Sequence, residues 1–171
     1  MLQKLSVKTL TDIDQVKEHL KVEHDLENDL INRYIDTAHN FVEDYTSIAI
    51  GEQRFVEHLT PDLTDDHVFL SMNPVNEIEE VVEINEVTGE QTTLTDYVII
   101  NNGLGTRIKA TPKRSYKVTY KAGYDVNAVP QQMNQAILLI VADMYEHREE
   151  RVKQKRTSVE YLLNQISIKK I

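Results

Sequence analysis

The chain has 171 residues with a formal net charge of -9, and it contains no cysteine, five glycines and four prolines. This length fits one domain of ordinary size, and so few glycines and prolines exclude collagen-like and low-complexity chains. The lack of cysteine excludes disulfide frameworks, thiolate metal sites and thiol nucleophiles, and no apolar run approaches the ~20 residues of a membrane span, so we expect a soluble, acidic, globular protein.

Two helices are predicted in the first fifty residues. A short helix over about 11–21 has Thr11 as its expected N-cap and carries Ile13, Val16 and Leu20 on one face. A longer helix over about 25–46 has apolar residues at spacings of three and four, which is typical of an amphipathic helix. Its apolar stripe comprises Leu26, Leu30, Tyr34, Ala38, Phe41 or Val42, and Tyr45, and is widened by Ile31 and Ile35.

From about residue 53 to residue 121 apolar and polar residues alternate, as they do in half-buried β-strands. The pair Thr88-Gly89 lies between two such runs and predicts a hairpin, and the segment Asn101–Gly105 predicts a second one. The run Ser115–Tyr120 is a further strand, with its two tyrosines and Val118 on one face. Because no helix intervenes, we expect these short strands to be antiparallel.

Pro130 opens a third helix over about 130–150, since proline is tolerated at the first helical position. The centre of this helix is apolar almost all round, so we expect it to be the core pillar against which the 25–46 helix packs. The charged stretch that follows is expected to be a mobile linker, and a short helix over about 158–166 then begins with Ser158 as its cap.

These elements predict an α+β fold that is mainly a helical bundle. Its helices lie near 11–21, 25–46, 130–150 and 158–166, and a small antiparallel β insert lies at about 53–121. We expect one domain over 1–150, which contains this insert. The segment 151–171 is then a mobile basic linker with a short C-terminal helix.

Charge is distributed unevenly along the chain. Residues 11–90 contain 21 acidic and four basic side chains, a net of -17, whereas residues 91–171 contain 13 basic and seven acidic ones, a net of +6. Either both halves are solvated surfaces of one domain, or an acidic side and a basic side favour head-to-tail contact between identical subunits. Clustered basic residues, which phosphate binding requires, occur between Arg148 and Arg156.

Residues with catalytic potential form no recognisable constellation. The six histidines show no metal-binding spacing such as HExxH, and the acidic pairs Asp65-Asp66 and Glu79-Glu80 do not follow the order of an EF-hand. The string Glu146–Glu150 is interpreted as a solvated helix end, and Asn102–Gly105 as a hairpin turn rather than a phosphate-binding loop. We therefore expect no catalytic, cofactor-binding or metal site, no cofactor, and no enzymatic activity.

Several segments, taken in order, resemble a known family. They are Leu10–Val22, Asp29–Thr46, Asn73-Pro74-Val75, the hairpin with Thr88-Gly89, Val118–Tyr124 and Val129–Glu149, of which Tyr120–Tyr124 and the part from Ala136 to Glu149 are the most specific. Their order and spacing resemble the tailed-bacteriophage head–tail connector family, the small adaptor proteins also described as DNA-packaging or head-completion proteins. The resemblance covers roughly residues 10–50 and 73–166.

The resemblance implies a structural virion protein without catalytic activity. Members of this family form a ring of about a dozen subunits beneath the portal at the capsid vertex, where heterologous contacts close the ring. The ring extends the DNA channel and binds the next connector or a tail-completion protein. DNA is then expected to pass through without sequence-specific binding, and no membrane is implied. The protein would lie at the head–tail junction, after assembly in the bacterial host cytoplasm or from a prophage gene.

The C-terminal segment of family members tends to engage the portal, which corresponds here to the basic stretch and the last helix. Opposed charges on the faces of each subunit would steer the assembly of such a ring. The candidate portal-binding residues are Arg151, Lys153, Lys155, Arg156, Leu162, Leu163, Ile166, Lys169 and Lys170.

Two other functions stay open on the residues alone. One is a non-enzymatic intracellular binding or regulatory module that recruits a partner through its C-terminal helix. The other is a small hydrolase that uses a histidine and an acidic pair, which requires those groups to converge in a pocket.

Overall fold

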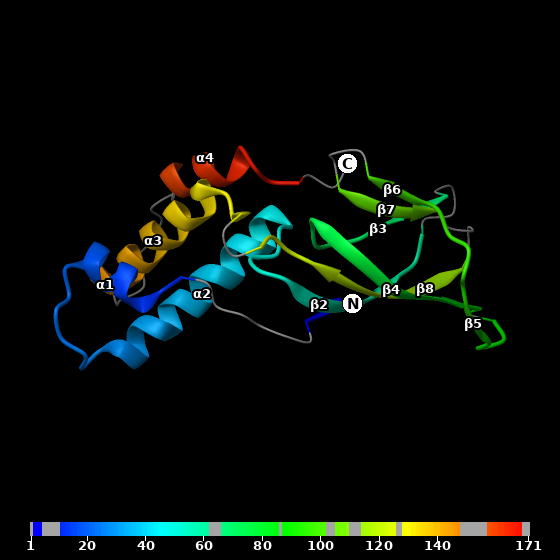
Figure 1. Cartoon of the computed structure of the whole chain (residues 1–171), viewed down its shortest axis with the longest axis horizontal. Helices are drawn as coiled ribbons and strands as arrows, with labels where there is room; N and C mark the ends of the chain where they lie inside the picture. The colour runs from blue at the N-terminus through cyan, green and yellow to red at the C-terminus, as the bar shows by residue number, and fades with distance from the viewer. Residues whose placement is uncertain are drawn as a thin grey trace.

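The computed structural model describes residues 2–4, 11–61, 66–85, 87–101, 105–109, 114–125, 128–147 and 157–168. Two lobes lie next to each other along the long axis of the molecule, one helical and one made of strands (Figure 1). The helices are α1 (Ile13–Leu20), α2 (Asn28–Thr46), α3 (Gln131–Glu146) and α4 (Thr157–Asn164). The strands are β1 (Leu2–Lys4), β2 (Gln53–Leu59), β3 (His67–Phe69), β4 (Val75–Ile84), β5 (Gln91–Thr93), β6 (Ile99–Asn101), β7 (Thr106–Lys109) and β8 (Ser115–Ala122).

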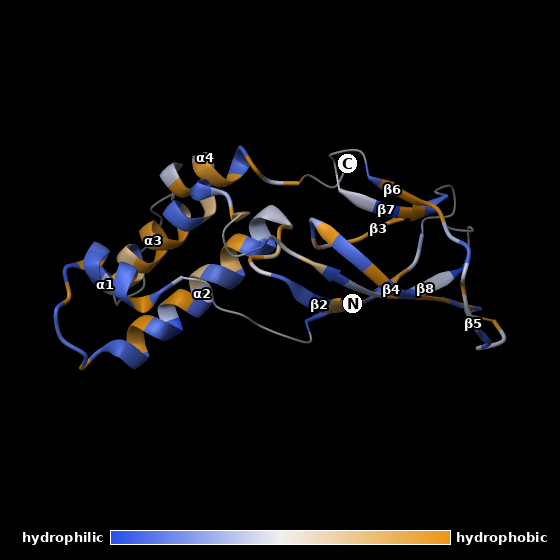
Figure 2. Cartoon of the chain, in the orientation of Figure 1, coloured by the Kyte–Doolittle hydropathy of each residue, from blue (hydrophilic) through white to orange (hydrophobic). Residues whose placement is uncertain are grey.

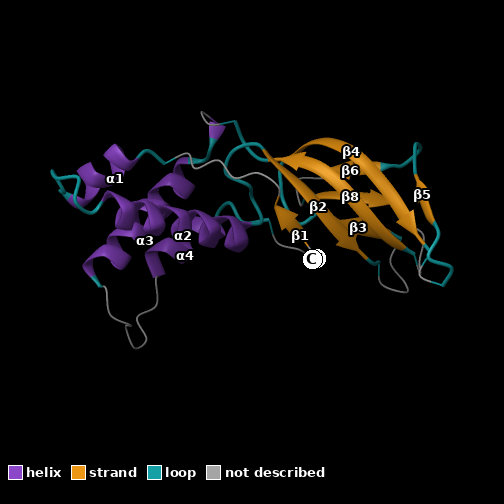
Figure 3. Cartoon of the chain, turned by 90° about the horizontal axis from the view of Figure 1, so that it is seen from below, coloured by secondary structure: helices purple, strands orange, loops and turns teal. Residues whose placement is uncertain are grey.

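The strands form two antiparallel sheets that share one core (Figure 3). One sheet has the order β1-β2-β8-β4-β5 and the other has the order β3-β7-β6. Phe55 stacks on Tyr120 with ring centroids 5.6 Å apart, and these rings pack with Val68 and Ile108 of the smaller sheet. The strand lobe is therefore a β-sandwich whose inner faces are apolar.

The prediction of a mainly helical bundle with a small β insert is wrong. Strands account for about 31% of the structure, and they have a core separate from that of the helices. Most of the strands are short, but the alternating apolar residues of one sheet pack against those of the other, which makes the strand region a full lobe. A strand at residues 2–4, outside the expected insert, also joins the larger sheet by pairing with β2.

The helical lobe is built around α3, as its apolar sequence predicted. Figure 2 shows hydrophobic stretches of α2 and α3 in the interior of this lobe. Leu26 was expected in the apolar stripe of α2, but it precedes the first residue of the helix and is 91% exposed. The residues buried between the helices include Ile31, Ile35, Ala38 and Val42 of α2, and Met133, Ala136, Ile137, Ile140 and Val141 of α3.

The helix starts differ slightly from the predicted ones. The N-cap of α1 is Asp12, whose carboxylate accepts a hydrogen bond from the Asp14 amide at 3.1 Å, whereas the Thr11 hydroxyl hydrogen-bonds His39 Nε2 at 2.7 Å. Pro130 precedes the first residue of α3, and α4 starts one residue before Ser158. Helix α3 ends at Glu146, with the non-helical His147 as its C-cap, rather than near residue 150 as predicted. Residues 148–150 and the predicted linker at 151–156 lie outside the described residues.

Both predicted hairpins are present. The turn between β4 and β5 is closed by a hydrogen bond from the Asn85 amide to the Glu90 carbonyl at 2.9 Å, and Gly89 adopts a φ of 72° there. The strands β6 and β7 pair in register from Ile99 to Asn101, while the central residues of their turn, 102–104, lie outside the described part of the chain. Strand β8 buries Tyr116, Val118 and Tyr120, as its alternation predicted.

A seam of backbone hydrogen bonds joins the two lobes. The Ala49 amide donates to the Asn73 carbonyl at 2.9 Å, the Asn73 amide donates to the Ser47 carbonyl at 3.0 Å, and the Tyr124 amide donates to the Ala49 carbonyl at 3.3 Å. The Ile168 amide donates to the Thr46 carbonyl at 2.9 Å. Segments from four parts of the sequence therefore meet where α2 ends.

A buried carboxylate reinforces this seam from the helical side. Glu43 of α2 is 3% exposed and accepts hydrogen bonds from the Ile50 amide and from Gln53 Nε2, each at 2.7 Å. Its other oxygen pairs with Lys4 Nζ at 2.7 Å. Because a buried charge is costly without such partners, Glu43 fixes β1 and the start of β2 against α2.

Gly123 is required at the seam because the backbone of Gly51 passes beside it. Its φ is 130°, and a Cβ placed there would lie 1.9 Å from the Gly51 carbonyl oxygen. Gly89 also has a positive φ, but nothing lies within 4 Å of a Cβ at that position. A substitution at Gly89 would therefore introduce backbone strain alone, whereas a substitution at Gly123 would introduce backbone strain and a steric clash.

Replacement of Gly123 by alanine is expected to lower the free energy of unfolding by about 3 kcal/mol or more, because strain and overpacking combine. Gly89→Ala is the matched control and is expected to cost about 1 kcal/mol, from the left-handed backbone alone. Chemical denaturation of both variants measures the difference. Equal losses in the two variants would contradict the role of Gly123 in joining the lobes.

Candidate interaction surfaces

The C-terminal helix α4 is docked onto the helical lobe. Leu163 is fully buried in the core with α2 and α3, and Leu162 and Ile166 are half-buried. Tyr45 donates a hydrogen bond from its hydroxyl to Asn164 Oδ1 at 3.0 Å. Of the three apolar residues predicted to bind a portal, Leu163 and Ile166 are thus packed in this chain's own helical core. The other six predicted residues, Arg151, Lys153, Lys155, Arg156, Lys169 and Lys170, lie outside the described residues.

The opposite side of α4 faces solvent, and its prominent residue is Tyr161. This side chain is 69% exposed, although tyrosine carries a large apolar ring. Glu160 and Asn164 flank it and are also exposed. Tyr161 was not among the predicted site residues. On a helical wheel Tyr161 lies opposite Val159 and Leu163, and this position could have indicated from the sequence that it is exposed.

The outer face of α2 is acidic. Asp29, Asp36 and Asp44 are exposed and recur at intervals of seven and eight residues, so they share one side of the helix. Phe41 borders this side, is 37% exposed and stacks on Tyr45 at 6.0 Å. We call Asp29, Asp36, Phe41 and Asp44 the α2 strip.

The outer face of the larger sheet carries charges that neutralise one another. Arg54 pairs with Glu79 at 2.6 Å, and Lys121 pairs with Glu77 at 2.8 Å and with Glu79 at 3.6 Å. The hydrogen bond from Arg54 lowers the pKa of Glu79, and the hydrogen bond to Glu77 raises the pKa of Lys121. These ion pairs are exposed, so each contributes little to stability.

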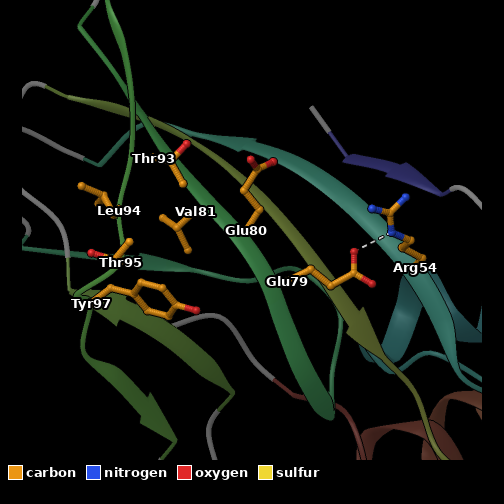
Figure 4. Close-up of a pocket in the computed structure, with 8 residues that line it drawn as sticks. All are labelled: Arg54, Glu79, Glu80, Val81, Thr93, Leu94, Thr95 and Tyr97. Carbon is orange, nitrogen blue, oxygen red and sulfur yellow. Dashed lines mark hydrogen bonds and ion pairs between the residues drawn. The ribbon is translucent and has the colours of Figure 1, made fainter.

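An open hollow of about 560 Å³ lies beside these ion pairs. In Figure 4 Arg54 and Glu79 lie at one end, while Val81, Leu94 and Tyr97 lie at the other. Glu79 is already paired with Arg54, and Thr93, Thr95 and Tyr97 contribute hydroxyl groups. The described residues that line the hollow thus include the acidic pair Glu79-Glu80 but no histidine.

The outer face of the smaller sheet combines basic and apolar side chains. The register of its strands places Phe69, Arg107, Lys109 and Ile100 on the face opposite the buried Val68 and Ile108. The Arg107 guanidinium lies over the Phe69 ring at 5.6 Å, Lys109 is exposed, and Val98, which directly precedes β6, is 53% exposed. We call Phe69, Val98, Ile100, Arg107 and Lys109 the β-face.

Buried polar groups hold loops in place through hydrogen bonds. Glu57 is 4% exposed and accepts hydrogen bonds from the Tyr120 hydroxyl at 3.0 Å and from the amide and hydroxyl of Ser71. Burial raises the pKa of Tyr120 far above its ordinary value. Burial likewise lowers the pKa of His39, against the opposing effect of the nearby Glu43. Among the described residues no three His, Asp or Glu side chains are placed to hold a metal ion.

Comparison with known proteins shows the family to which the chain belongs. The sequence model of the head completion protein family matches residues 9–170, nearly the whole chain. The chain belongs to the head completion protein family. No curated protein sequence matches it. None of the helices within the described residues has the length and apolarity needed to cross a membrane.

Chains from gene transfer agent (GTA) particles have a similar fold. A chain in the neck of an empty GTA particle, computed with C6 symmetry, has a TM-score of 0.80 at 19% identity. Chains in the virion of a native GTA particle and in the neck of a native particle computed with C12 symmetry have TM-scores of 0.79 and 0.76, each at 20% identity. Each comparison covers 100% of this chain and 97% of the other chain.

Family membership confirms the resemblance to head–tail connectors. This head completion protein is a structural component of phage-like virions that acts in their assembly, where head and tail join. The structure also explains one of the most specific motifs, Tyr120–Tyr124. Tyr120 hydrogen-bonds Glu57, Ala122 is fully buried, and Gly123 allows the close approach of Gly51, so the motif anchors the end of β8 at the seam.

The two sides of α4 are expected to respond differently to truncation. Leu163→Ala leaves a cavity in the helical core and is expected to lower the free energy of unfolding by about 2–5 kcal/mol. Tyr161→Ala removes an exposed ring and is expected to change that free energy by less than about 0.5 kcal/mol. Thermal unfolding of both variants measures this. A Leu163→Ala protein as stable as the wild type would mean that α4 does not dock in solution.

The stability of the protein is expected to fall as the pH drops below about 6.5. In the folded state the lowered pKa keeps His39 neutral, whereas in the unfolded chain it takes up a proton near its ordinary pKa, so acid favours unfolding. Denaturation between about pH 8 and about pH 5 measures the slope. His39→Gln should flatten it, while His19→Gln, on the exposed side of α1, should leave it unchanged; equal slopes in all three proteins would contradict the assignment.

Proposed function

We propose that this head completion protein forms a ring at the portal vertex of the capsid, joins head to tail and extends the DNA channel. The observation that carries the proposal is the match of the family over nearly the whole chain. It is supported by the likeness of the fold to chains of GTA necks that were computed with C6 and C12 symmetry. DNA passes through such a ring without sequence-specific contacts, and the role requires neither a cofactor nor catalysis.

The portal is proposed to contact the C-terminal part of the chain. The buried Leu163 and the half-buried Ile166 hold α4 in position, so the contacts come from the exposed Tyr161 and from basic residues that precede and follow the helix in the sequence. These are Arg151, Lys153, Lys155 and Arg156 before α4, and Lys169 and Lys170 after it. In this proposal the segment 151–171 acts with the body of the protein, to which α4 contributes core residues, rather than as an independent tail.

The opposite partner in the ring assembly is a further connector or a tail-completion protein. Two hydrophobic side chains stand out at the ends of the molecule, Leu26 between α1 and α2 and Val87 in the β4–β5 turn, and they are 91% and 95% exposed. Figure 1 places these turns at opposite ends of the long axis. A subunit of this shape can therefore reach separate partners with its two lobes.

Mixing the protein with its portal is expected to yield a complex that contains several copies of the chain per portal. Native mass spectrometry gives the copy number, and negative-stain microscopy shows whether the copies surround a central channel. Ring formation is expected to weaken from about 50 to about 500 mM salt, because contacts between exposed charges are screened. A chain that stays monomeric with its portal at every salt concentration would contradict the proposed function.

Tyr161→Ala combined with Lys169→Ala and Lys170→Ala is the matched test of the portal contact. We expect this variant to fold like the wild type and to lose most of its affinity for the portal, because aromatic and basic anchors dominate such interfaces. Deletion of the whole segment is a poorer test, since it also removes Val159 and Leu163 from the core. Unchanged portal affinity in the triple variant would place the contact elsewhere.

A further inference from the structure

We propose that neighbouring copies of this protein meet through the α2 strip of one copy and the β-face of the next. The α2 strip is Asp29, Asp36, Phe41 and Asp44, and the β-face is Phe69, Val98, Ile100, Arg107 and Lys109. This inference rests on the proposed ring, and it adds the surfaces that form the contact.

The β-face contains two cations, Arg107 and Lys109. Arg107 and Lys109 form no ion pair with any described residue, and the buried Nε of Arg107 has no hydrogen-bond partner there. The larger sheet differs, because its Arg54 and Lys121 are paired with Glu79 and Glu77. An acidic partner can therefore form new ion pairs with Arg107 and Lys109 of the β-face without displacing existing pairs of these two residues.

The α2 strip has the complementary chemistry. Asp29 and Asp44 are exposed and have no side-chain ion pair with a described residue, and Phe41 adds an exposed ring at the border of the strip. On the α2 strip the apolar Phe41 lies beside acidic residues, and on the β-face apolar residues, chiefly the 53% exposed Val98, lie beside cations. The two surfaces are therefore complementary. Arginine and aromatic residues at the centre with charges around them are typical of protein interfaces.

The α2 strip and the β-face also face in opposite directions. In Figure 1 the outer side of α2 faces away from α3, and the outer side of the β3-β7-β6 sheet faces away from the larger sheet, so the two surfaces lie on opposite sides of the molecule. One copy cannot bring its own two surfaces together. A contact between them is heterologous, and repeated heterologous contacts generate a ring when the rotation closes.

Disulfide trapping tests this contact on a clean background, because the chain has no cysteine. Asn40→Cys lies on the outer face of α2 between Asp36 and Asp44, and Ile100→Cys lies on the β-face; both substitutions leave the charges in place. Gln91→Cys, on the exposed β5, is the matched control. Mixtures of single-cysteine proteins are oxidised in the presence of the portal and separated by mass.

We expect the mixture of N40C and I100C to give a disulfide-linked dimer in clear excess over the N40C and Q91C mixture, and neither N40C nor I100C alone to do so. Excess N40C–N40C dimers would indicate a symmetric contact and overturn the proposal. No excess in any mixture would also overturn it. If wild-type rings form under these conditions, the proposed function then stands and the surface assignment alone fails; if no ring forms, both fail.

Charge reversal provides a second, independent readout. Asp44→Lys or Lys109→Asp alone is expected to weaken association by roughly fivefold, and a mixture in which D44K meets K109D is expected to recover it. No recovery would contradict direct pairing of the two surfaces. Basic residues also suit DNA, so binding of a 30-bp duplex is measured by fluorescence anisotropy, with the length set at about three helical turns. Loss of duplex binding in K109D, without any loss of association, would make the β-face a DNA-facing surface and overturn the proposal.

Discussion

The carboxylate of Glu43 lies in the interior near the C-terminal end of α2, where it binds the Ile50 amide, the Gln53 side chain and Lys4. These three partners belong to the segment after α2, to β2 and to β1, so a single buried charge ties the helical lobe to the β-sandwich. Such a charge is stable only with these partners in place. The relative position of the two lobes, and with it the placement of every exposed surface, depends on this interaction.

Because the two lobes are joined, the uneven distribution of charge along the sequence becomes an uneven distribution of charge over the surface of the molecule. The acidic first half supplies the outer face of α2, with Asp29 and Asp44, and the basic second half supplies Arg107 and Lys109 on the smaller sheet. The larger sheet mixes both halves, and its charges pair internally, as in the pair of Arg54 with Glu79. The charge imbalance between the two halves of the sequence thus appears as charged surfaces on α2 and on the smaller sheet. On the larger sheet it is neutralised by ion pairs.

Local periodicity made the helices and hairpins predictable, because it reports which side of an element is buried. The β-sandwich was not predictable in this way, since β8 pairs with β2 and β4 from distant parts of the chain and β1 is three residues long. The apolar residues of α4 show a second limit. Leu163 fits either a partner's groove or the chain's own core, and only the fold shows that it lies in the core and that Tyr161 is the exposed residue.

We propose that identical subunits, each with its two lobes joined at the seam, close a ring between head and tail. A density map of the neck of the assembled virion, determined by electron cryomicroscopy without imposed symmetry, tests this most directly. The account predicts several copies of the chain around a central channel, with α2 of each copy against the β3-β7-β6 sheet of its neighbour. A single copy, or copies whose α2 and β3-β7-β6 surfaces both face solvent, would contradict it.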